Sequence, residues 1–264
     1  RTGSFKIRGA TNRIATLSEA EKEAGVITAS AGNHAQGVAL AATRAGVDAK
    51  IVMPEHAPIA KVDATESYGG EVILFGNDYN DAQARAHEIE ELEGRTYVHA
   101  FDDEYVMAGQ GTIGLEIAEQ CPEADTVVVP IGGGGLISGV ATALKGKLDD
   151  VRVIGVQAEG ASSVARSLEK GKRHELDAVD TIADGIATRS VGEKPWEIIQ
   201  ERVDEVVTVS DNEIALALTY LLERSKTLVE GAGAVALAAV LAEKFDYADD
   251  EVIVPALCGG NIDL

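Results

Sequence analysis

Short apolar runs alternate with amphipathic segments along most of the chain. The runs have the length and composition of buried parallel strands, and the segments between them repeat apolar residues at the spacing of one helix face. We predict strands at 26–29, 50–53, 72–75, 126–131, 151–157, 206–209 and 252–257. We predict helices at 34–44, 59–68, 81–92, 136–145 and 212–224. This alternation is typical of an α/β fold.

The order of these elements predicts two open, mostly parallel, twisted sheets flanked by helices. We expect a small domain at 25–101 and a large domain formed by 1–24 together with 102–264. Ser210 and Glu213 have the spacing of a capping box at the start of the last predicted helix. Because ligands of such sheets bind at the carboxyl ends of the strands, we expect the chemistry in the loops there.

Charge and hydropathy exclude several kinds of partner. The chain has 44 acidic and 23 basic residues among 264, a formal net charge of −21. This charge opposes binding to nucleic acid or to an anionic membrane surface. The longest apolar stretch, 232–242, is far shorter than the ~20 residues of a spanning helix. The acidic residues are spread along the chain, so we expect an acidic solvated surface. A salt-rich cytoplasm, where salt screens the repulsion between these charges, is one hypothesis, and an ordinary acidic protein is the alternative.

Cysteine and histidine usage argues against structural disulfides and metal sites. Cys121 and Cys258 are the only cysteines, and the five histidines lack the spacing of metal ligands. We therefore expect no metal and a reducing, cytoplasmic location. No signal peptide is visible, and both ends give the impression of a longer protein that has been cut.

Four consecutive glycines stand directly between a predicted strand and a predicted helix. They are Gly132, Gly133, Gly134 and Gly135. Their backbone N–H groups can converge on an anion, and the helix N-terminus adds favourable dipole charge. The spacing matches neither the dinucleotide fingerprint nor a P-loop. The segment therefore predicts a phosphate cradle, with a tight turn that binds no ligand as the alternative.

A second loop also joins a strand to a helix. It consists of Ser30, Ala31, Gly32, Asn33 and His34. A hydroxyl, free backbone donors and a helix N-terminus together suit a small carboxylate. The alternative is helix capping by Ser30 or Asn33.

Five segments, in the same order, resemble a known family. They are TGSFKIRGA, SAGNHAQGVA, IGGGGLISG, VEGAGAVALAA and CGGNIDL. The chain resembles the fold type II pyridoxal-phosphate enzymes, and most closely the threonine/serine dehydratases, from Arg1 to Leu264. Without this resemblance, Lys6 would be interpreted as an ordinary solvated lysine.

The resemblance implies a role for each matching position. Lys6 would hold pyridoxal 5'-phosphate as a Schiff base and, once released by the substrate, remove the α-proton. Phe5 would pack against the cofactor ring and Asn33 would bind its hydroxyl. The glycines 132–135 would bind the phosphate, and Glu230 would lie near the ring. The loop from Ser30 to His34, with its backbone at Ala31 and Gly32, would hold the substrate carboxylate.

Two departures from the family pattern bear on the reaction. Many members carry Ser where this chain has Cys258, beside the pyridine nitrogen, although the vertebrate-type serine dehydratases also carry Cys. A neutral thiol supplies no negative charge to keep that nitrogen protonated, which favours rapid loss of a β leaving group over a long-lived carbanion. The related serine racemases carry a proton-exchanging Ser at the position of Ala31, so racemisation is disfavoured here.

A third departure concerns metal binding. Members with a divalent-cation site carry an acid at the position of Glu159 and another six residues later, where this chain has Ala165. A metal role for Glu159 is therefore not expected.

The implied activity is a dehydratase that converts L-threonine to 2-oxobutanoate and ammonia, with L-serine as a second substrate giving pyruvate. The resemblance also implies a homo-oligomer, a dimer or tetramer. A β-replacement enzyme or threonine synthase on the same fold is the alternative within enzymes. A phosphate-ligand binding protein without catalysis is the alternative from another class.

Overall fold

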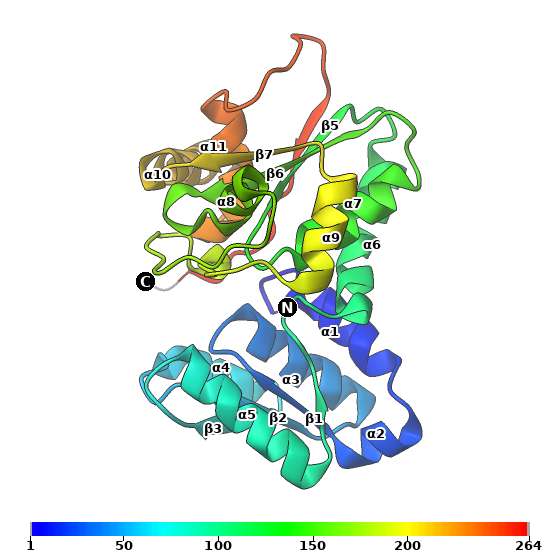
Figure 1. Ribbon diagram of the computed structural model, residues 1–264, viewed down its shortest axis with the longest axis vertical. Helices are drawn as coiled ribbons and strands as arrows, with labels where there is room; N and C mark the ends of the chain where they lie inside the picture. Colours follow the sequence, from blue (N-terminus) through cyan, green and yellow to red (C-terminus); the bar gives the residue numbers. More distant parts are fainter. Residues whose placement is uncertain (1, 263–264) are drawn as a thin grey trace. The chain divides into compact units, whose positions relative to one another are not determined.

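The computed structural model describes residues 2–262, and the strands within that range form two four-stranded sheets in which every pair is parallel. The chain divides into two compact units, Arg1–Gly109 and Gln110–Leu264, and each contains one sheet with its own helices (Figure 1). The predicted α/β class, with two parallel sheets flanked by helices, is confirmed.

The first unit holds the strand order β3-β2-β1-β4. Its strands are β1 (Val26–Ala29), β2 (Ala49–Met53), β3 (Glu71–Leu74) and β4 (Thr96–Tyr97). Its helices are α1 (Lys6–Ala15), α2 (Glu19–Ala24), α3 (Asn33–Ala45), α4 (Ile59–Ser67) and α5 (Tyr79–Glu93).

Successive strand residues of this sheet face opposite layers of helices. Ile51 and Met53 pack in one cluster with apolar residues of α1 and α3, whereas Ile27 and Val52 pack in another with α5. This is the side-chain period of two in a sheet covered on both faces. The four residues of β1 are accordingly all buried.

The second unit holds the strand order β7-β6-β5-β8. Its strands are β5 (Thr126–Pro130), β6 (Arg152–Ala158), β7 (Glu205–Val209) and β8 (Ile253–Pro255). Its longer helices are α7 (Gly135–Lys145), α8 (Ser163–Lys170), α9 (Glu193–Arg202), α10 (Asp211–Tyr220) and α11 (Gly231–Leu241). The shorter ones are η1 (Glu159–Ala161), η2 (Asp184–Ile186) and η3 (Leu221–Ser225), a single turn of π-helix. Helix α6 (Glu104–Gln120) begins in the first unit and ends in the second.

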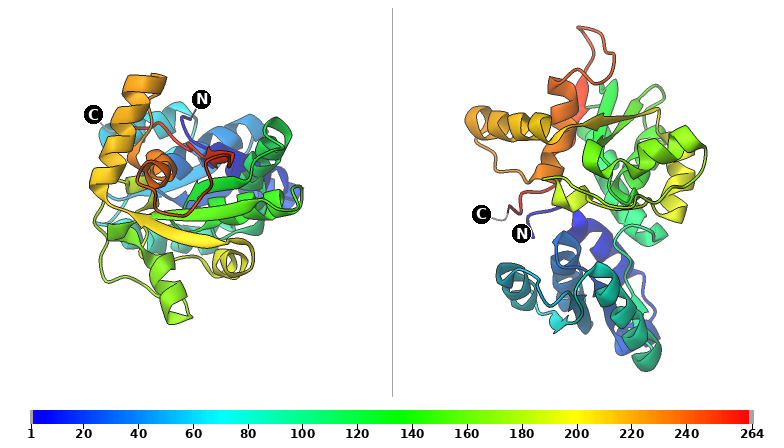
Figure 2. Two further views of the ribbon diagram at one scale, coloured as in Figure 1. Left: turned by 90° about the horizontal axis from the view of Figure 1, so that it is seen from above. Right: turned by 60° about the vertical axis from the view of Figure 1, so that its left-hand side comes forward.

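The second sheet is also covered on both faces (Figure 2). Helices α10 and α11 share one buried cluster with Ile154 and Val156 of β6. Gly155, between them in sequence, lies against Ile131 and Ile137 on the side of α7, where a Cβ atom would overlap Ile131. Seven of the eleven residues of α11 are buried and they are small or β-branched, which lets the helix lie close to the strands.

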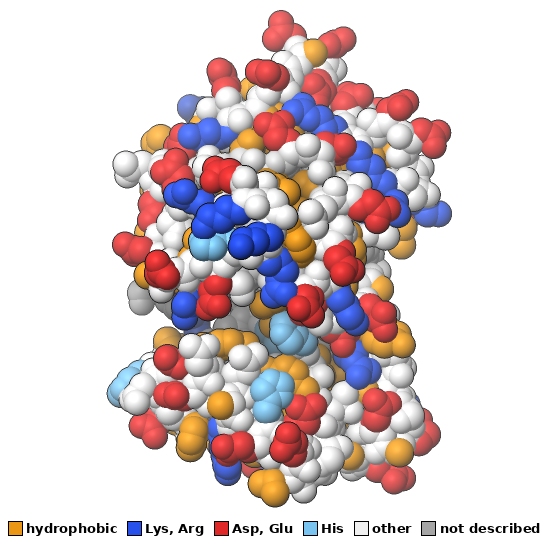
Figure 3. Space-filling view, viewed as in Figure 1, with side chains coloured by type: hydrophobic (Ala, Val, Ile, Leu, Met, Phe, Trp, Pro, Cys, Tyr) orange, Lys and Arg blue, Asp and Glu red, His pale blue; other side chains and the backbone are white. Residues whose placement is uncertain are grey.

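Charged side chains of both signs lie on the surface (Figure 3). Acidic side chains are scattered over the face drawn in Figure 3, with lysines and arginines between them. Ion pairs among the described residues include Arg95 with Asp48 at 2.7 Å and Lys145 with Asp204 at 2.7 Å. None of the helices described is long and apolar enough to cross a membrane.

The predicted capping box is confirmed: Ser210 Oγ accepts from the Glu213 N–H, and the Glu213 carboxylate accepts from the Ser210 N–H. Residues 1–24 and 102–109 fall in the first compact unit. Their predicted assignment to the large domain stays a prediction.

Candidate active site

Lys6 is the first residue of α1, and backbone from another part of the unit holds its amine. Lys6 Nζ donates to the carbonyl oxygen of Ala100 at 2.8 Å and lies 5.3 Å from the centre of the Phe5 ring. Helix α1 begins close to α3. Gly37 of α3 is so near that a Cβ atom added to it would lie 3.1 Å from the carbonyl carbon of Lys6. The start of α1 is thus fixed by contacts far away in the sequence.

The loop of residues 30–34 lies at the carboxyl end of β1 and leads directly into α3. Gly32 precedes the helix and donates its N–H to Ser30 Oγ at 3.2 Å. Residues 30–33 are half-buried, and α3 runs for 13 residues, so its N-terminus carries an appreciable positive partial charge. The loop can therefore bind an anion with backbone and hydroxyl donors.

The ring of His34 is buried and faces the segment after β4. Its Nε2 lies 2.9 Å from the carbonyl oxygen of Val98, which also accepts from Thr28 Oγ1 at 2.8 Å. A carbonyl only accepts, so Nε2 carries the proton. Burial, followed by the charge of Lys6, lowers the pKa of His34 to about 3. The neutral ring presents a lone pair at Nδ1, which has no hydrogen-bond partner among the described residues.

The glycine loop follows β5 and opens α7. Gly134 has φ 94°, a conformation that disfavours any side chain. A Cβ atom there would also lie 2.7 Å from Pro195 Cβ, and one at Gly132 would lie 3.0 Å from Ile186 Cα. Packing and backbone conformation therefore both require glycine, while the N–H groups at the start of α7 favour an anion.

Glu230 and Cys258 are close together in the second unit. Cys258 Sγ donates to the carbonyl oxygen of Ala256 at 3.4 Å, and burial, with a smaller effect of the Glu230 charge, raises its pKa to about 12. The Glu230 N–H donates to the carbonyl oxygen of Gly259 at 3.0 Å. Glu230 Oε1 lies so close to Gly259 that a Cβ atom added to this glycine would overlap it. Cys258 is therefore a neutral thiol beside a carboxylate.

The structure groups the sequence-predicted residues into one set in each unit. In the first unit, Lys6 and Phe5 lie near the loop of residues 30–34, because the charge of Lys6 is close enough to His34 to lower the pKa of its ring. In the second unit, the glycine loop and Cys258 follow the paired strands β5 and β8, whose carboxyl ends share one sheet edge.

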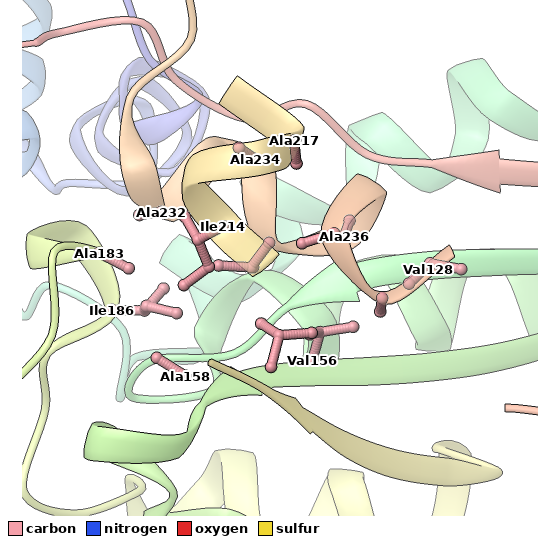
Figure 4. Packing of buried hydrophobic residues seen from close by; sticks show 14 of the residues in the cluster. Val128, Val156, Ala158, Ala183, Ile186, Ile214, Ala217, Ala232, Ala234 and Ala236 are labelled. Atoms are coloured by element: carbon pink, nitrogen blue, oxygen red, sulfur yellow. The ribbon is translucent and has the colours of Figure 1, made fainter. Parts of the chain in front are cut away.

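Helix η2 links the two parts of the second set. Ile186 lies against Gly132, while Gly185 lies against Ala232, with a hypothetical Cβ 2.9 Å from the Ala232 Cβ. Figure 4 shows Ile186 and Ala232 with the buried residues around them. The glycine loop and the start of α11 are thereby tied to the same short helix.

Sequence reasoning missed the segment of residues 98–102. Val98 and Ala100 act through backbone carbonyls, which every residue type has, so the sequence gives no sign of this role. His99 accepts two backbone N–H groups at Nδ1, from Phe101 at 3.2 Å and Asp102 at 2.8 Å. A lone histidine outside a motif gives no signal for such a role.

Comparison with known proteins shows which family the chain resembles. The family model described as pyridoxal-phosphate dependent enzyme matches residues 1–259. The chain belongs to this family. It is 51% identical over 264 residues to the L-threonine ammonia-lyase of Thermotoga maritima, and 49% identical over 265 aligned positions to the catabolic L-threonine dehydratase TdcB of Escherichia coli K12. Both matches cover the whole chain, which spans 65% and 80% of the length of these relatives.

Solved structures of the family are also similar over the whole chain. The processed threonine deaminase isoform 2 of Solanum lycopersicum has a TM-score of 0.94 at 44% identity, with 77% of its chain covered. Maize serine racemase has a TM-score of 0.96 at 40% identity, with 81% covered. The fold type II resemblance is thereby confirmed.

The residues present fit the cofactor of this family, pyridoxal phosphate. The first unit offers the Lys6 amine and two buried polar atoms without a hydrogen-bond partner among the described residues, Ser4 Oγ and His34 Nδ1. The second unit offers a glycine loop at a helix N-terminus and a neutral thiol at Cys258. Among residues 2–262, no three His, Cys, Asp or Glu side chains gather as a metal site.

Proposed function

We propose that this chain is the catalytic core of an L-threonine ammonia-lyase that forms 2-oxobutanoate and ammonia, with L-serine as a second substrate giving pyruvate. One observation carries the proposal. Relatives at 51% and 49% identity, matched over the whole chain, bear the names L-threonine ammonia-lyase and L-threonine dehydratase.

The cofactor would supply the electron sink for bond breaking at the substrate α-carbon. We propose that Lys6 Nζ anchors it, that Phe5 and Asn33 contact its ring, and that Gly132–Gly135 hold its phosphate through backbone N–H groups. Glu230 would lie near the ring.

Lys6 would also move the proton of the α-carbon. Proton transfer needs an amine held in one place, because a general base acts only within hydrogen-bond reach. The carbonyl of Ala100 accepts one N–H of Lys6 at 2.8 Å and so limits the directions that the amine can take.

The loop of residues 30–34 would bind the substrate carboxylate. Ser30 offers a hydroxyl, and it stands with Ala31, Gly32 and Asn33 at the start of α3, where the helix N-terminus favours an anion. The ring of His34 donates to Val98 and presents a lone pair on its other side, which repels a carboxylate. We therefore propose that His34 contributes its backbone N–H to the carboxylate.

Cys258 would stand beside the pyridine nitrogen as a neutral hydrogen-bond donor. Its raised pKa, about 12, leaves it without charge at physiological pH. A partner of this kind does not hold a proton on the ring nitrogen as a carboxylate would, which favours expulsion of the β-hydroxyl over prolonged carbanion chemistry.

Product analysis tests the proposal. The chain with pyridoxal phosphate and L-threonine is expected to release 2-oxobutanoate and ammonia in equal amounts without any second nucleophile. Turnover that depends on an added nucleophile would instead identify a β-replacement enzyme or threonine synthase. Cofactor binding without turnover of either amino acid would identify a non-catalytic binding protein.

We further propose that the protein is a homo-oligomer, a dimer or tetramer, and that it acts in the cytoplasm. Large apolar side chains exposed in the second unit favour assembly: Leu216 is 69% exposed, and Leu222 and Leu228 are each 58% exposed. Sedimentation equilibrium is expected to give twice or four times the monomer mass, and a monomer would contradict the proposal.

A further inference from the structure

A single peptide unit connects Lys6 to His99, a residue that the proposed mechanism does not use. The carbonyl of Ala100 accepts from Lys6 Nζ at 2.8 Å. The N–H of Phe101 belongs to the same planar peptide and donates to His99 Nδ1 at 3.2 Å. Because the C=O and N–H of a trans peptide point in opposite directions, fixing the N–H also fixes the direction of the carbonyl.

The His99 ring is held on several sides. Its Nδ1 also accepts the Asp102 N–H at 2.8 Å, and its ring forms a T-shaped pair with the Phe101 ring, with centroids 4.7 Å apart. The Tyr97 ring lies on another side, with centroids 6.1 Å apart. These contacts orient Nδ1 toward the turn of residues 99–102.

The two accepted bonds also define the protonation state of His99. Since Nδ1 accepts from two N–H groups, the ring proton must be on Nε2. Burial, the largest influence, lowers the pKa of His99; Asp102 and Asp103 raise it, while Lys6 and His87 lower it further. Protonation of Nδ1 would remove its lone pair and release the turn.

We propose that His99 is a positioning residue for Lys6. Through the peptide between Ala100 and Phe101, its Nδ1 lone pair aims the carbonyl that holds Lys6 Nζ, both before the amine takes the cofactor and whenever the substrate frees it. The catalytic part of this inference rests on the proposed function. The positioning itself concerns only the first unit.

Two substitutions of His99 distinguish the effect of an acceptor at the Nδ1 position from the effect of losing the imidazole ring. In His99→Asn, the side-chain oxygen stands close to the position of Nδ1 and can accept from the backbone two and three residues on, as in Asx turns. In His99→Gln, the oxygen lies one bond farther out and cannot reach those N–H groups in the same way. His56, which is exposed in the same unit, supplies the control variant His56→Gln.

The rate at which cofactor-free protein captures pyridoxal phosphate, followed by visible absorbance, measures how well Lys6 is placed. His99→Gln is expected to slow capture roughly fivefold, the effect of one lost hydrogen bond, while His99→Asn and His56→Gln stay near wild type. Equal capture rates in His99→Gln and wild type would overturn the proposal, as would equal slowing in both His99 variants.

Nitrogen NMR of the wild-type chain labelled at histidine keeps the proposal testable where a variant does not fold. The expected His99 signals are those of an unprotonated Nδ1 and a protonated Nε2, and a protonated Nδ1 would overturn the proposal. Neither readout needs turnover. If the variants behave as expected and no 2-oxo acid forms from threonine, only the proposed function fails.

Discussion

Ala31 places a methyl group in the loop that is predicted to hold the substrate carboxylate. A methyl group exchanges no proton, whereas racemisation needs a second acid or base on the opposite face of the α-carbon. The solved structures similar to this chain include a serine racemase. Position 31 is therefore a residue at which lyase and racemase chemistry can be separated.

We expect Ala31→Ser to acquire measurable racemisation of L-serine, because its hydroxyl adds a proton-exchanging group. Chiral chromatography of serine after incubation with the cofactor-loaded enzyme measures the D-enantiomer. Ala31→Val serves as the control, since it changes size without adding a proton donor. D-serine production by the wild type at the same rate as Ala31→Ser would contradict this assignment.

His34 makes stability depend on pH. Its folded pKa of about 3 lies below its ordinary value of 6.5, so the unfolded chain binds this proton more readily. The stability from neutral His34 is fully present above pH 6.5 and is lost as pH falls toward about 3, by up to ~1.4 kcal/mol per pH unit.

In His34→Gln the amide can still donate to Val98, but it does not titrate. We expect the free energy of unfolding of the wild type to fall more steeply than that of His34→Gln between pH 6 and 4 in urea titrations. Parallel curves for the two proteins would show that His34 is not buried in its neutral form.

Among the elements, the glycine loop before α7 combines two constraints that a substitution can separate. Gly134 has φ 94° and a crowded Cβ position, whereas Gly171, after α8, has φ 66° with nothing within 4 Å of a Cβ atom. We expect Gly134→Ala to cost about 2–4 kcal/mol and to weaken cofactor binding, and Gly171→Ala to cost about 1 kcal/mol with binding unchanged. Chemical denaturation and cofactor titration measure both effects. Equal costs at the two positions would contradict the observed packing.

The elements differ in how far their sequences predicted them. Strands β1 and β5 are continuous apolar runs and helices α3 and α7 follow a helical period, with glycine or polar residues at their boundaries, and the structure places all of them close to the predicted positions. Strand β4 has two residues, too few for a period, and α1 has glycine and β-branched residues that weaken its helix signal. The π-helical turn at 221–225 departs from the 3.6 period on which the prediction of 212–224 depended.

The candidate site divides in the same way. Lys6, the loop of residues 30–34 and the glycine loop stand in motifs, so they were predicted. The carbonyl of Ala100 and the lone pair of His99 act through backbone geometry that only the folded chain defines.

At the scale of the whole molecule, the chain has a formal net charge of −21. Like charges repel one another at low ionic strength, and added salt screens them within about 3 Å at 1 M. The exposed ion pairs lose strength with salt as well, but such pairs contribute only about 0–1 kcal/mol each. We therefore expect the thermal midpoint to rise between low and molar KCl, as measured by circular dichroism. A midpoint that is unchanged or lower would contradict a surface dominated by self-repulsion.

The central claim for the whole molecule is that one lysine anchors the cofactor. Borohydride reduction of the chain incubated with pyridoxal phosphate, followed by peptide mass spectrometry, tests this claim most directly. The account predicts that the cofactor is attached to the peptide that contains Lys6, and that Lys6→Ala loses both this label and the release of 2-oxobutanoate from threonine. Attachment at another lysine in the wild type, or full activity in Lys6→Ala, would contradict it.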